Sequence, residues 1–334
     1  MSIYHGNCLR VDLTAHKIQR GSTPENGIGA RTWNSVTLLR ELEAGIDPLG
    51  PENILCISVG PLTGSELIAT CRFIASAKSP LTGYLGDSGA RGFFAPEMRW
   101  AGHDQIIFTG ASDRWVYLWI DNDQVEIRDA SHLLGLDITE TTVRLRQELR
   151  DPDLQVAAIG PAGEKLVRYS IISCNLARAA GRTGMGAVMG SKKLKAIVVR
   201  GDRPVKPADP ERFRRACAQL KSNLGGHRDF EARRRYGTTR IMDSLARMGV
   251  LPAYHYRSTV FENLDKVCAE ALRSNHVVKA KSCYNCNVFC SRYNYTSYGE
   301  GEGPEYEAQA AFTVKCGNSD LELAVGVSNA VNRL

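Results

Sequence analysis

The sequence predicts an α+β protein with a strand-rich first region, residues 1–205, and a mainly helical second region, residues 206–334. Three observations support this fold class. Strand patterns dominate the first region, helical spacing of apolar residues dominates the second, and a linker containing glycine and proline separates them. A length of 334 residues is sufficient for about two domains of ordinary size.

Six segments of the first region have the patterns of β-strands. Three alternate apolar and polar residues, as expected for strands with one buried face, and three are short apolar runs typical of fully buried strands. In chain order they are residues 9–13, 54–59, 116–120, 125–128, 156–159 and 196–199. Helical spacing predicts two helices between them, at residues 31–42 and 139–149, with Asp137 or Thr139 as the N-cap of the second.

The second region follows a predicted linker at residues 201–207. Its first helix is expected to start at Asp209-Pro210-Glu211, because proline is favoured at the first position of a helix. Further helices are expected at residues 238–248 and 263–272. A last helix starts at Ser319-Asp320-Leu321-Glu322, which has the pattern of a capping box. No stop signal follows it before Leu334, and this pattern suggests a domain that is cut short.

The first region also contains a weak internal repeat. Val59-Gly60-Pro61 follows one predicted buried strand, and Ile159-Gly160-Pro161 follows another. Each is succeeded by a further strand and then by a turn rich in arginine and glycine, at residues 87–92 and 178–186. The sequence therefore predicts two related halves within the first region.

The two turns have a composition that suits an anionic ligand. Glycine lets backbone N–H groups approach an anion closely, and arginine forms bidentate hydrogen bonds with phosphate. The turn at residues 178–186 contains two arginines and three glycines, but it matches neither the Walker A loop nor the Gly-x-Gly-x-x-Gly fingerprint. A flexible surface loop is the alternative interpretation.

Cys283, Cys286 and Cys290 are close enough in sequence to bind one metal centre. Their C-x2-C-x3-C spacing is more typical of an iron–sulfur cluster than of zinc, which usually has two separated pairs of ligands. A zinc site completed by His276 or Cys316 remains an alternative. A cubane cluster normally has four cysteine ligands, so the fourth is expected from elsewhere or from a larger assembly.

Glu307 is a candidate for proton transfer. Pro304 and the acidic residues Glu302 and Glu305 are explained as the entry to a helix, where they offset the helix dipole. Glu307 is expected to lie inside an otherwise apolar helix. Burial there would favour the protonated carboxyl and suit it to general acid–base chemistry.

The composition limits the classes of partner and compartment. A net charge of +6, from 42 basic and 36 acidic residues, is mild and suits a small anionic ligand better than nucleic acid. Arg233-Arg234-Arg235 beside Tyr236 is interpreted as a solvated helix face. No apolar segment is long enough to span a bilayer and no signal peptide is recognisable, so we expect a cytoplasmic protein. In that reducing compartment the ten cysteines are not expected to form disulfides.

Taken in order, these motifs resemble the aldehyde ferredoxin oxidoreductase family, whose members are tungsten- or molybdenum-dependent pterin enzymes. The likeness extends along most of the chain. The matching segments are residues 27–31, 60–64, 78–83, 100–104, 127–132, 159–164, 186–192 and 236–238, the three cysteines, and residues 303–307.

The resemblance implies a first domain of two β-sheets related by approximate two-fold symmetry, which cradles two pterin cofactors that chelate one tungsten or molybdenum ion. Part of a mainly helical domain would follow and supply three cysteine ligands to a [4Fe–4S] cluster. Arg72 would lie between the cluster and a pterin, and Glu307 would transfer protons near the metal. The implied cofactor-binding residues are Arg72, Gly89, Arg91, Gly92, Arg178, Ala179, Gly181, Arg182 and Gly184.

The implied activity is the oxidation of an aldehyde to a carboxylate, with electrons passing singly through the cluster to ferredoxin or an electron-transfer subunit. Two alternatives remain. The chain is similar to subunits of aromatic acyl-CoA reductase complexes, and it could also be an inactive remnant with a structural metal site.

The sequence departs from the family pattern in two respects. It lacks the family's fourth cluster cysteine, two Asp-x-x-Gly-Leu motifs and a catalytic histidine, all of which come later in the chain, so a missing C-terminal half or a partner subunit is expected. Gly89-Ala90-Arg91-Gly92 stands where the family has asparagine followed by two glycines. A magnesium ion between the pterin phosphates would lose its asparagine ligand there, and Arg91 adds a positive charge that could replace part of its function.

Overall fold

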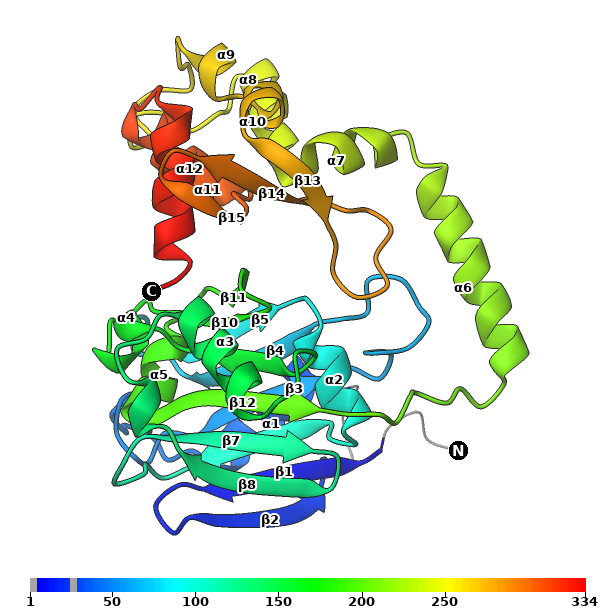
Figure 1. Cartoon of the computed structure of the whole chain (residues 1–334), viewed down its shortest axis with the longest axis vertical. Coiled ribbons are helices and arrows are strands. Elements are labelled where there is room, and N and C mark those ends of the chain that lie inside the picture. The colour runs from blue at the N-terminus through cyan, green and yellow to red at the C-terminus, as the bar shows by residue number, and fades with distance from the viewer. Residues whose placement is uncertain (1–4, 25–28) are drawn as a thin grey trace. The chain divides into compact units, whose positions relative to one another are not determined.

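The computed structural model describes residues 5–24 and 29–334, so residues 27 and 28 of the first matching segment lie outside the described part (Figure 1). The chain divides into two compact units. Unit 1 comprises Met1–Arg214 with Arg333–Leu334, and unit 2 comprises Arg215–Asn332. The helix α6 (Pro210–Gly225) contains the boundary and begins after the predicted linker.

Unit 1 contains two six-stranded mixed sheets among its described residues. The first sheet has the strand order β2-β1-β6-β3-β4-β5, and β1 pairs with β6 in parallel while the other neighbours are antiparallel. The strands are β1 (Asn7–Asp12), β2 (Lys17–Ser22), β3 (Leu55–Val59), β4 (Phe73–Lys78), β5 (Leu85–Ala90) and β6 (Gln105–Thr109).

The second sheet has the order β11-β10-β9-β12-β7-β8, with β7 parallel to β12 and the remaining pairs antiparallel. Its strands are β7 (Val116–Asp121), β8 (Gln124–Asp129), β9 (Gln155–Ala158), β10 (Ile172–Cys174), β11 (Arg178–Ala180) and β12 (Leu194–Arg200). Strand β1 corresponds to β7, β2 to β8, and so on up to β6 and β12. With this correspondence the two sheets have the same strand order and the same parallel pair.

The helices repeat in the same way. α1 (Arg31–Glu41) and α3 (Ile138–Glu148) precede the third strand of their sheets, and α2 (Phe94–Trp100) and α5 (Met185–Ser191) precede the sixth. α2 packs on β9 and β12 of the second repeat, whereas α5 packs on β3 and β4 of the first. The equivalent edge strands β5 and β11 contact each other. This reciprocal packing confirms the predicted domain of two related sheets.

The core of unit 1 explains why the predicted buried strands are apolar runs. β3 is buried at every position, because α1 of its own repeat and α5 of the other repeat both pack on it. One apolar cluster contains fully buried side chains from both repeats, such as Phe73 and Ile197. Phe73 also makes an edge-to-face contact with Phe94, with ring centroids 5.2 Å apart.

Two buried basic side chains cross between the repeats at equivalent places. His103 lies two residues before β6, and its Nε2 is 3.1 Å from the carbonyl oxygen of Asn122. Lys192 lies two residues before β12, and its Nζ donates to Gly110 O at 2.8 Å and to Asn53 O. Burial lowers the pKa of His103 to about 4 and that of Lys192 to about 8.

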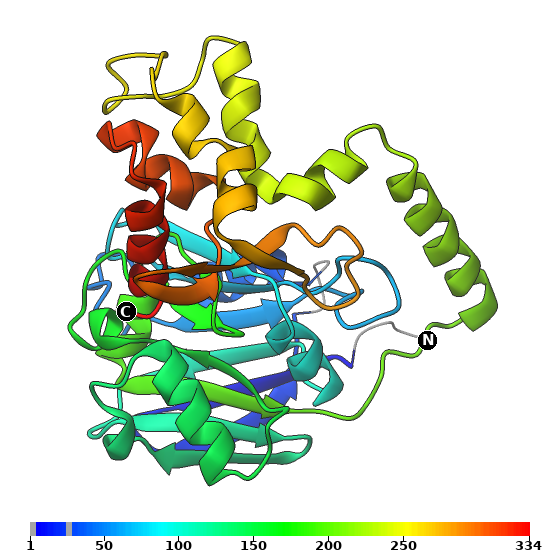
Figure 2. The same cartoon turned by 45° about the horizontal axis from the view of Figure 1, so that its top comes forward.

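Unit 2 is mainly helical but also contains a three-stranded antiparallel sheet, which the sequence did not predict. Its further helices are α7 (Phe230–Tyr236), α8 (Arg240–Arg247), α9 (Leu264–Val267), α10 (Ala269–Asn275), α11 (Tyr306–Phe312) and α12 (Leu321–Val331). The strands are β13 (Val277–Lys281), β14 (Ser291–Thr296) and β15 (Gly299–Glu302). α12 packs against α11, β14 and β15 (Figure 2).

Two of the predicted helices differ from the observed helices in their bounds. The predicted helix at 263–272 is divided into α9 and α10, because Cys268 has an extended backbone with ψ of 175°. The last helix begins one residue later than predicted: Asp320, not Ser319, is the N-cap and accepts from the Leu323 N–H at 3.0 Å. Glu322 accepts from the Ser297 N–H at 2.7 Å instead of completing a capping box.

The N-cap of α3 is Asp137, one of the two predicted candidates, and it forms a complete capping box with Glu140. Within residues 5–24 and 29–334, no helix is long and apolar enough to cross a membrane.

We expect His103 to make the stability of unit 1 sensitive to acid. The unfolded histidine titrates near pH 6.5 and the folded one near 4, so the stability that the neutral imidazole provides is present above pH 6.5 and is lost as pH falls towards 4. The difference corresponds to roughly 3 kcal/mol. Urea unfolding at pH 7, 5 and 4 should show that H103Q, which keeps a donor, loses less free energy than the wild type. The exposed His227→Gln variant should follow the wild type, and equal acid sensitivity of H103Q would contradict this role.

Candidate functional site

The two predicted anion-binding turns occupy equivalent positions in the repeats and lie side by side. The predicted turns are shorter than expected: residues 87–90 belong to β5, Arg178–Ala180 form β11, and residues 185–186 begin α5. The remaining residues 91–92 lead from β5 towards α2, and residues 181–184 join β11 to α5. The Arg182 N–H donates to Ser88 Oγ at 2.9 Å, and Ser79 Oγ donates to the Thr183 carbonyl at 2.8 Å. The structure thus brings together residues that lie about half the length of unit 1 apart in the sequence.

Glycine is required at one position in each turn. Gly184 has φ of 72°, and a Cβ there would collide with the carbonyl oxygen of Arg168. Gly92 has φ of 124°, and a Cβ there would collide with the side-chain oxygen of Asn175. Both positions need the left-handed backbone region and a close approach of another segment, which together only glycine allows.

Asn175, which no sequence motif indicated, couples the two turns. Its Oδ1 accepts from the backbone N–H of Phe93 at 2.8 Å and of Phe94 at 3.3 Å, so a residue of the second repeat caps the start of α2 in the first. The adjacent Cys174 thiol donates to the Arg91 carbonyl at 3.3 Å. The backbone of Asn175 has φ of 52°, a conformation for which asparagine is favoured among non-glycine residues, but one asparagine in a loop carries no such signal in the sequence.

A chain of hydrogen bonds joins strand β5, which leads into the first turn, to the helix α1. Asp87 accepts from Ser76 Oγ at 2.8 Å, and Ser76 Oγ in turn accepts from Asn34 Nδ2 at 3.0 Å. Asn34 also accepts from Ser58 Oγ at 2.7 Å. On its other oxygen, Asp87 forms an ion pair with Arg31. These contacts fix β5 against the helix α1 and limit the movement of the turn that follows it.

The arginines of the site lie at the surface of this junction. Arg91 and Arg182 are exposed, and Arg178 is half-buried. Arg72 is exposed at the start of β4, and its Cδ lies 3.1 Å from where a Cβ of Gly89 would be. The nine predicted cofactor-binding residues therefore all belong to the strands β4, β5 and β11 or the turns next to them. Four guanidinium groups beside two glycine-rich turns have the donor set that binds phosphate.

The three cysteines lie in unit 2, in the loop between β13 and β14. The Cys286 N–H donates to the Cys283 carbonyl at 3.2 Å, and Asn285 and Phe289 have positive φ values of 45° and 51°. The loop is therefore a succession of tight turns. We call residues 283–290 the cysteine loop.

The buried Arg292 holds the cysteine loop against α7. Its guanidinium donates to the Phe289 carbonyl at 2.6 Å and to the Arg234 carbonyl at 2.5 Å. Burial lowers the pKa of Arg292. Gly237, at the end of α7, packs so closely on the loop that a Cβ would collide with the Cys290 carbonyl. Gly237 belongs to the matching segment at residues 236–238, whereas no pattern in the sequence indicates the role of Arg292.

Three thiols in one short loop are the donor type that iron–sulfur clusters use. In the described part of the chain, however, no three His, Cys, Asp or Glu side chains are arranged to hold a metal ion. The donor chemistry of the cysteine loop fits the implied cluster, whereas the ligand geometry is not formed.

The expectation that Glu307 is enclosed by an apolar helix is wrong. Its side chain is 70% exposed in the first turn of α11, and Oε2 is 2.9 Å from Lys315 Nζ. The helix dipole and this ion pair explain a carboxylate at that position. Burial alone would lower the pKa of Lys315, but the hydrogen bond with Glu307 and the nearby Tyr256 raise it overall.

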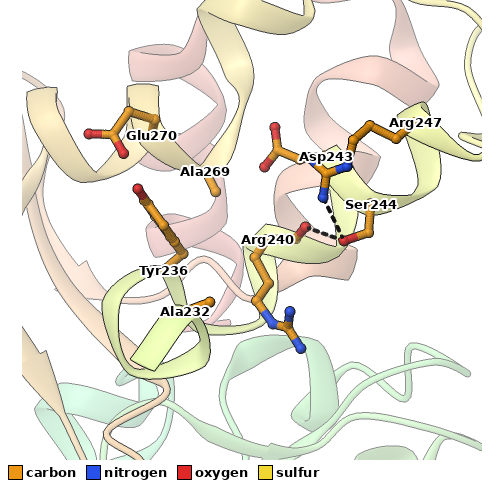
Figure 3. A pocket seen from close by; sticks show the side chains of 8 residues that line it. All are labelled: Ala232, Tyr236, Arg240, Asp243, Ser244, Arg247, Ala269 and Glu270. Atoms are coloured by element: carbon orange, nitrogen blue, oxygen red, sulfur yellow. Dashed lines mark hydrogen bonds between the residues drawn. The ribbon is translucent and has the colours of Figure 1, made fainter. Parts of the chain in front are cut away.

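A hollow of about 270 Å³ lies elsewhere in unit 2, between α7, α8 and the start of α10 (Figure 3). Its lining has side chains of both charge signs and none of the predicted site residues. The residues are Ala232, Tyr236, Arg240, Asp243, Ser244, Arg247, Ala269 and Glu270. Desolvation raises the pKa of Asp243, although the Ala269 N–H donates to its carboxylate.

A duplicated six-stranded sheet with arginine and glycine residues gathered at the junction of the repeats, followed by a thiol-bearing loop in a helical unit, defines the class of protein. Two family models match this chain. The model described as aldehyde ferredoxin oxidoreductase, N-terminal domain, matches residues 8–201, and that described as aldehyde ferredoxin oxidoreductase, domains 2 and 3, matches residues 215–334. The chain belongs to the aldehyde ferredoxin oxidoreductase family, as its sequence resemblance predicted.

Curated relatives support the same family of oxidoreductases. The tungsten-containing aldehyde ferredoxin oxidoreductase of Pyrococcus abyssi is 40% identical over 329 residues, which cover 95% of this chain and 53% of the relative. A Pyrococcus furiosus protein described as an aliphatic sulfonate oxidoreductase, WOR-like subunit, is 31% identical over 360 residues, covering 100% of this chain and 57% of the relative. The chain spans about half the length of the curated relatives it matches.

A solved structure has the same fold. The active-site complex BamBC of benzoyl coenzyme A reductase, determined with 1,5-dienoyl-CoA, contains a chain that matches with a TM-score of 0.88 and 30% identity. The match covers 99% of this chain and 53% of that one.

We expect Gly184→Ala to destabilise unit 1 by roughly 2–4 kcal/mol, because alanine adds backbone strain and a collision with a main-chain carbonyl. Gly181→Ala is the matched control. Gly181 is in the same turn, but the nearest atoms to an added Cβ are 3.8 Å away, so its effect should stay within about 1 kcal/mol. Denaturant unfolding of both variants checks this, and equal destabilisation would show that the Arg168 contact is unimportant.

Proposed function

We propose that this chain forms the pterin- and cluster-binding portion of an enzyme that oxidises aldehydes to carboxylates. The observation that carries the proposal is the convergence of the two equivalent turns, which places Arg91, Arg178 and Arg182 around one junction between the repeats. Membership of the family and its tungsten-containing relatives support this cofactor class.

In this proposal each repeat contributes one turn to the phosphates of the pterins. The second turn provides Arg178, Ala179, Gly181, Arg182 and Gly184, and the first provides Gly89, Arg91 and Gly92, with Arg72 beside Gly89. Arg91 supplies positive charge where a magnesium ion would otherwise balance the phosphates. The backbone N–H groups and guanidiniums orient the cofactor and neutralise its charge without any movement of the rigid strands.

A tungsten or molybdenum bis-pterin centre would supply the transfer of an oxygen atom: aldehyde and water give a carboxylic acid, two electrons and two protons. Glu307 is the proposed proton acceptor through its exposed Oε2, with Lys315 as the neighbouring cation. Cys283, Cys286 and Cys290 are the proposed ligands of a [4Fe–4S] cluster, from which ferredoxin takes the electrons. The proposed location is the cytoplasm, where reducing conditions preserve thiolate ligands.

Residues that correspond to the other half of the relatives, on a longer chain or in a partner subunit, are proposed to complete the substrate cavity and the cluster. A second candidate is the reduction of an aromatic acyl-CoA thioester as a subunit of a complex, which the similarity to BamBC favours. An inactive form with a structural zinc site is the outcome expected if neither activity is present.

Anaerobic assays distinguish these functions. Protein purified with its native partners should reduce a viologen dye when an aldehyde is added and should form the carboxylate in the ratio of one carboxylate to two electrons. Reduction of benzoyl-CoA by a reduced dye without aldehyde oxidation would favour the second candidate. Zinc without iron, together with neither activity, would contradict both.

We expect Cys286→Ser to remove most of the iron and the visible absorbance of anaerobically purified protein, because one thiolate ligand is lost. Cys316→Ser is the matched control, since Cys316 is exposed and lies outside the cysteine loop. Iron analysis of both variants is the measurement. Iron content that is unchanged in C286S would remove the cysteine loop from the cluster assignment.

We expect Glu307→Gln to lower turnover of the holoenzyme at least about tenfold while metal and pterin contents stay unchanged, because an amide cannot accept the proton. Folding stability should change by less than about 1 kcal/mol, since the ion pair is exposed. Lys315→Met breaks the same pair but keeps the carboxylate, so it should retain much more activity. Equal loss in the two variants would assign the effect to the ion pair.

A further inference from the structure

Arg292 is a buried cation that donates its hydrogen bonds to neutral main-chain groups. It lies on the covered face of β14, where its side chain is 2% exposed. Its guanidinium donates to the carbonyl oxygens of Phe289 at 2.6 Å, Ser291 at 2.7 Å and Arg234 at 2.5 Å. Within residues 5–24 and 29–334 it forms no ion pair, and its Nε is buried without a hydrogen-bond partner. Arginine is almost never fully buried unless its charge is paired, so a counter-ion is expected.

The cysteine loop is the source of negative charge that acts most strongly on Arg292. Burial lowers the pKa of this guanidinium, and a thiolate at Cys290 raises it. Glu305 raises it more weakly, and its carboxylate accepts a hydrogen bond from the Thr238 hydroxyl. A Cβ added to Gly237 would collide with the Cys290 carbonyl and lie 3.6 Å from Nη2 of Arg292, so the guanidinium is close to the main chain of Cys290. The counter-ion is therefore expected at the thiols.

We propose that Arg292 is a positioning residue that provides the counter-charge for the iron–sulfur cluster of the cysteine loop and so favours the reduced form of the cluster. A cluster held by thiolates is an anion, and each electron that it takes up adds a further negative charge. A fixed positive charge in a buried, weakly polar environment stabilises the more negative state. Arginine suits this role because it stays protonated at every physiological pH. The inference rests on the proposed function, which assigns the cluster to this loop.

A purely structural role is the alternative, because the same guanidinium attaches the loop to α7. Two substitutions separate charge from hydrogen bonding. Arg292→Lys keeps the charge but loses the planar set of donors, whereas Arg292→Gln keeps an N–H donor and loses the charge. Both are expected to lower the free energy of unfolding, so stability alone does not distinguish the two roles. The reduction potential of the cluster does, because it depends on the charge around the cluster.

The experiment is a redox titration of the cluster, followed by electron paramagnetic resonance in anaerobic protein purified with its native partners. R292Q is expected to shift the midpoint potential to a more negative value, and R292K is expected to stay much closer to the wild type. Arg234→Gln is the matched control. Arg234 is one of the three consecutive arginines that are exposed on α7, as predicted, so solvent screens the charge that this variant removes and the potential should hardly change.

Equal shifts in R292K and R292Q, or a shift in R234Q as large as that in R292Q, would overturn the proposal. Iron content is measured on the same samples. Iron lost from R292Q but kept by R292K would support the proposal, because binding of the cluster would then depend on the charge, whereas iron lost from both would show a structural role only. Folded wild-type protein without iron would contradict the proposed cluster and this inference with it. An unchanged potential in R292Q that retains its iron would contradict this inference alone.

Discussion

The hydrogen bonds between the two equivalent turns of unit 1 determine the geometry of the candidate cofactor site. Arg182 and Ser88, Ser79 and Thr183, and Asn175 with the start of α2 each join one repeat to the other. Strands β5 and β11 are edge strands of separate sheets, so the strand pairing within either sheet does not set the distance between Arg91, which follows β5, and Arg178 of β11. The candidate cofactor site is therefore formed by the interface between the repeats rather than by one loop.

The reciprocal packing of α2 and α5 explains how that interface stays rigid. α2 packs on the sheet of the other repeat and α5 packs on strands of both sheets, so the turns that precede these helices are held by the core of both halves. Gly92 and Gly184 allow the close approach of main-chain and side-chain atoms at the start of these helices. In unit 2 the same principle operates on a smaller scale, because Arg292 and Gly237 fix the cysteine loop against α7.

The sequence predicted the parts of this architecture that depend on local pattern. Apolar runs identified β3, β9 and β12, and the glycine and arginine content identified both turns. Buried strands and tight turns can be recognised in this way because each has a characteristic composition or periodicity. It missed the sheet β13–β15, whose strands are short and partly exposed, and it missed Asn175 and Arg292, whose roles arise from contacts distant in sequence. Glu307 was misjudged because apolar neighbours in sequence do not show which face of α11 is buried.

We propose that the junction between the repeats holds a metal–pterin cofactor. Mass spectrometry for tungsten and molybdenum on anaerobically purified protein, with fluorescence of the pterin released by acid, tests it most directly. We expect one of the two metals together with a stoichiometric pterin, both lost when Arg178 and Arg182 are replaced by alanine in protein that remains folded. Folded wild-type protein, purified with its partners, that contains neither metal nor pterin would show that the junction is not a cofactor site.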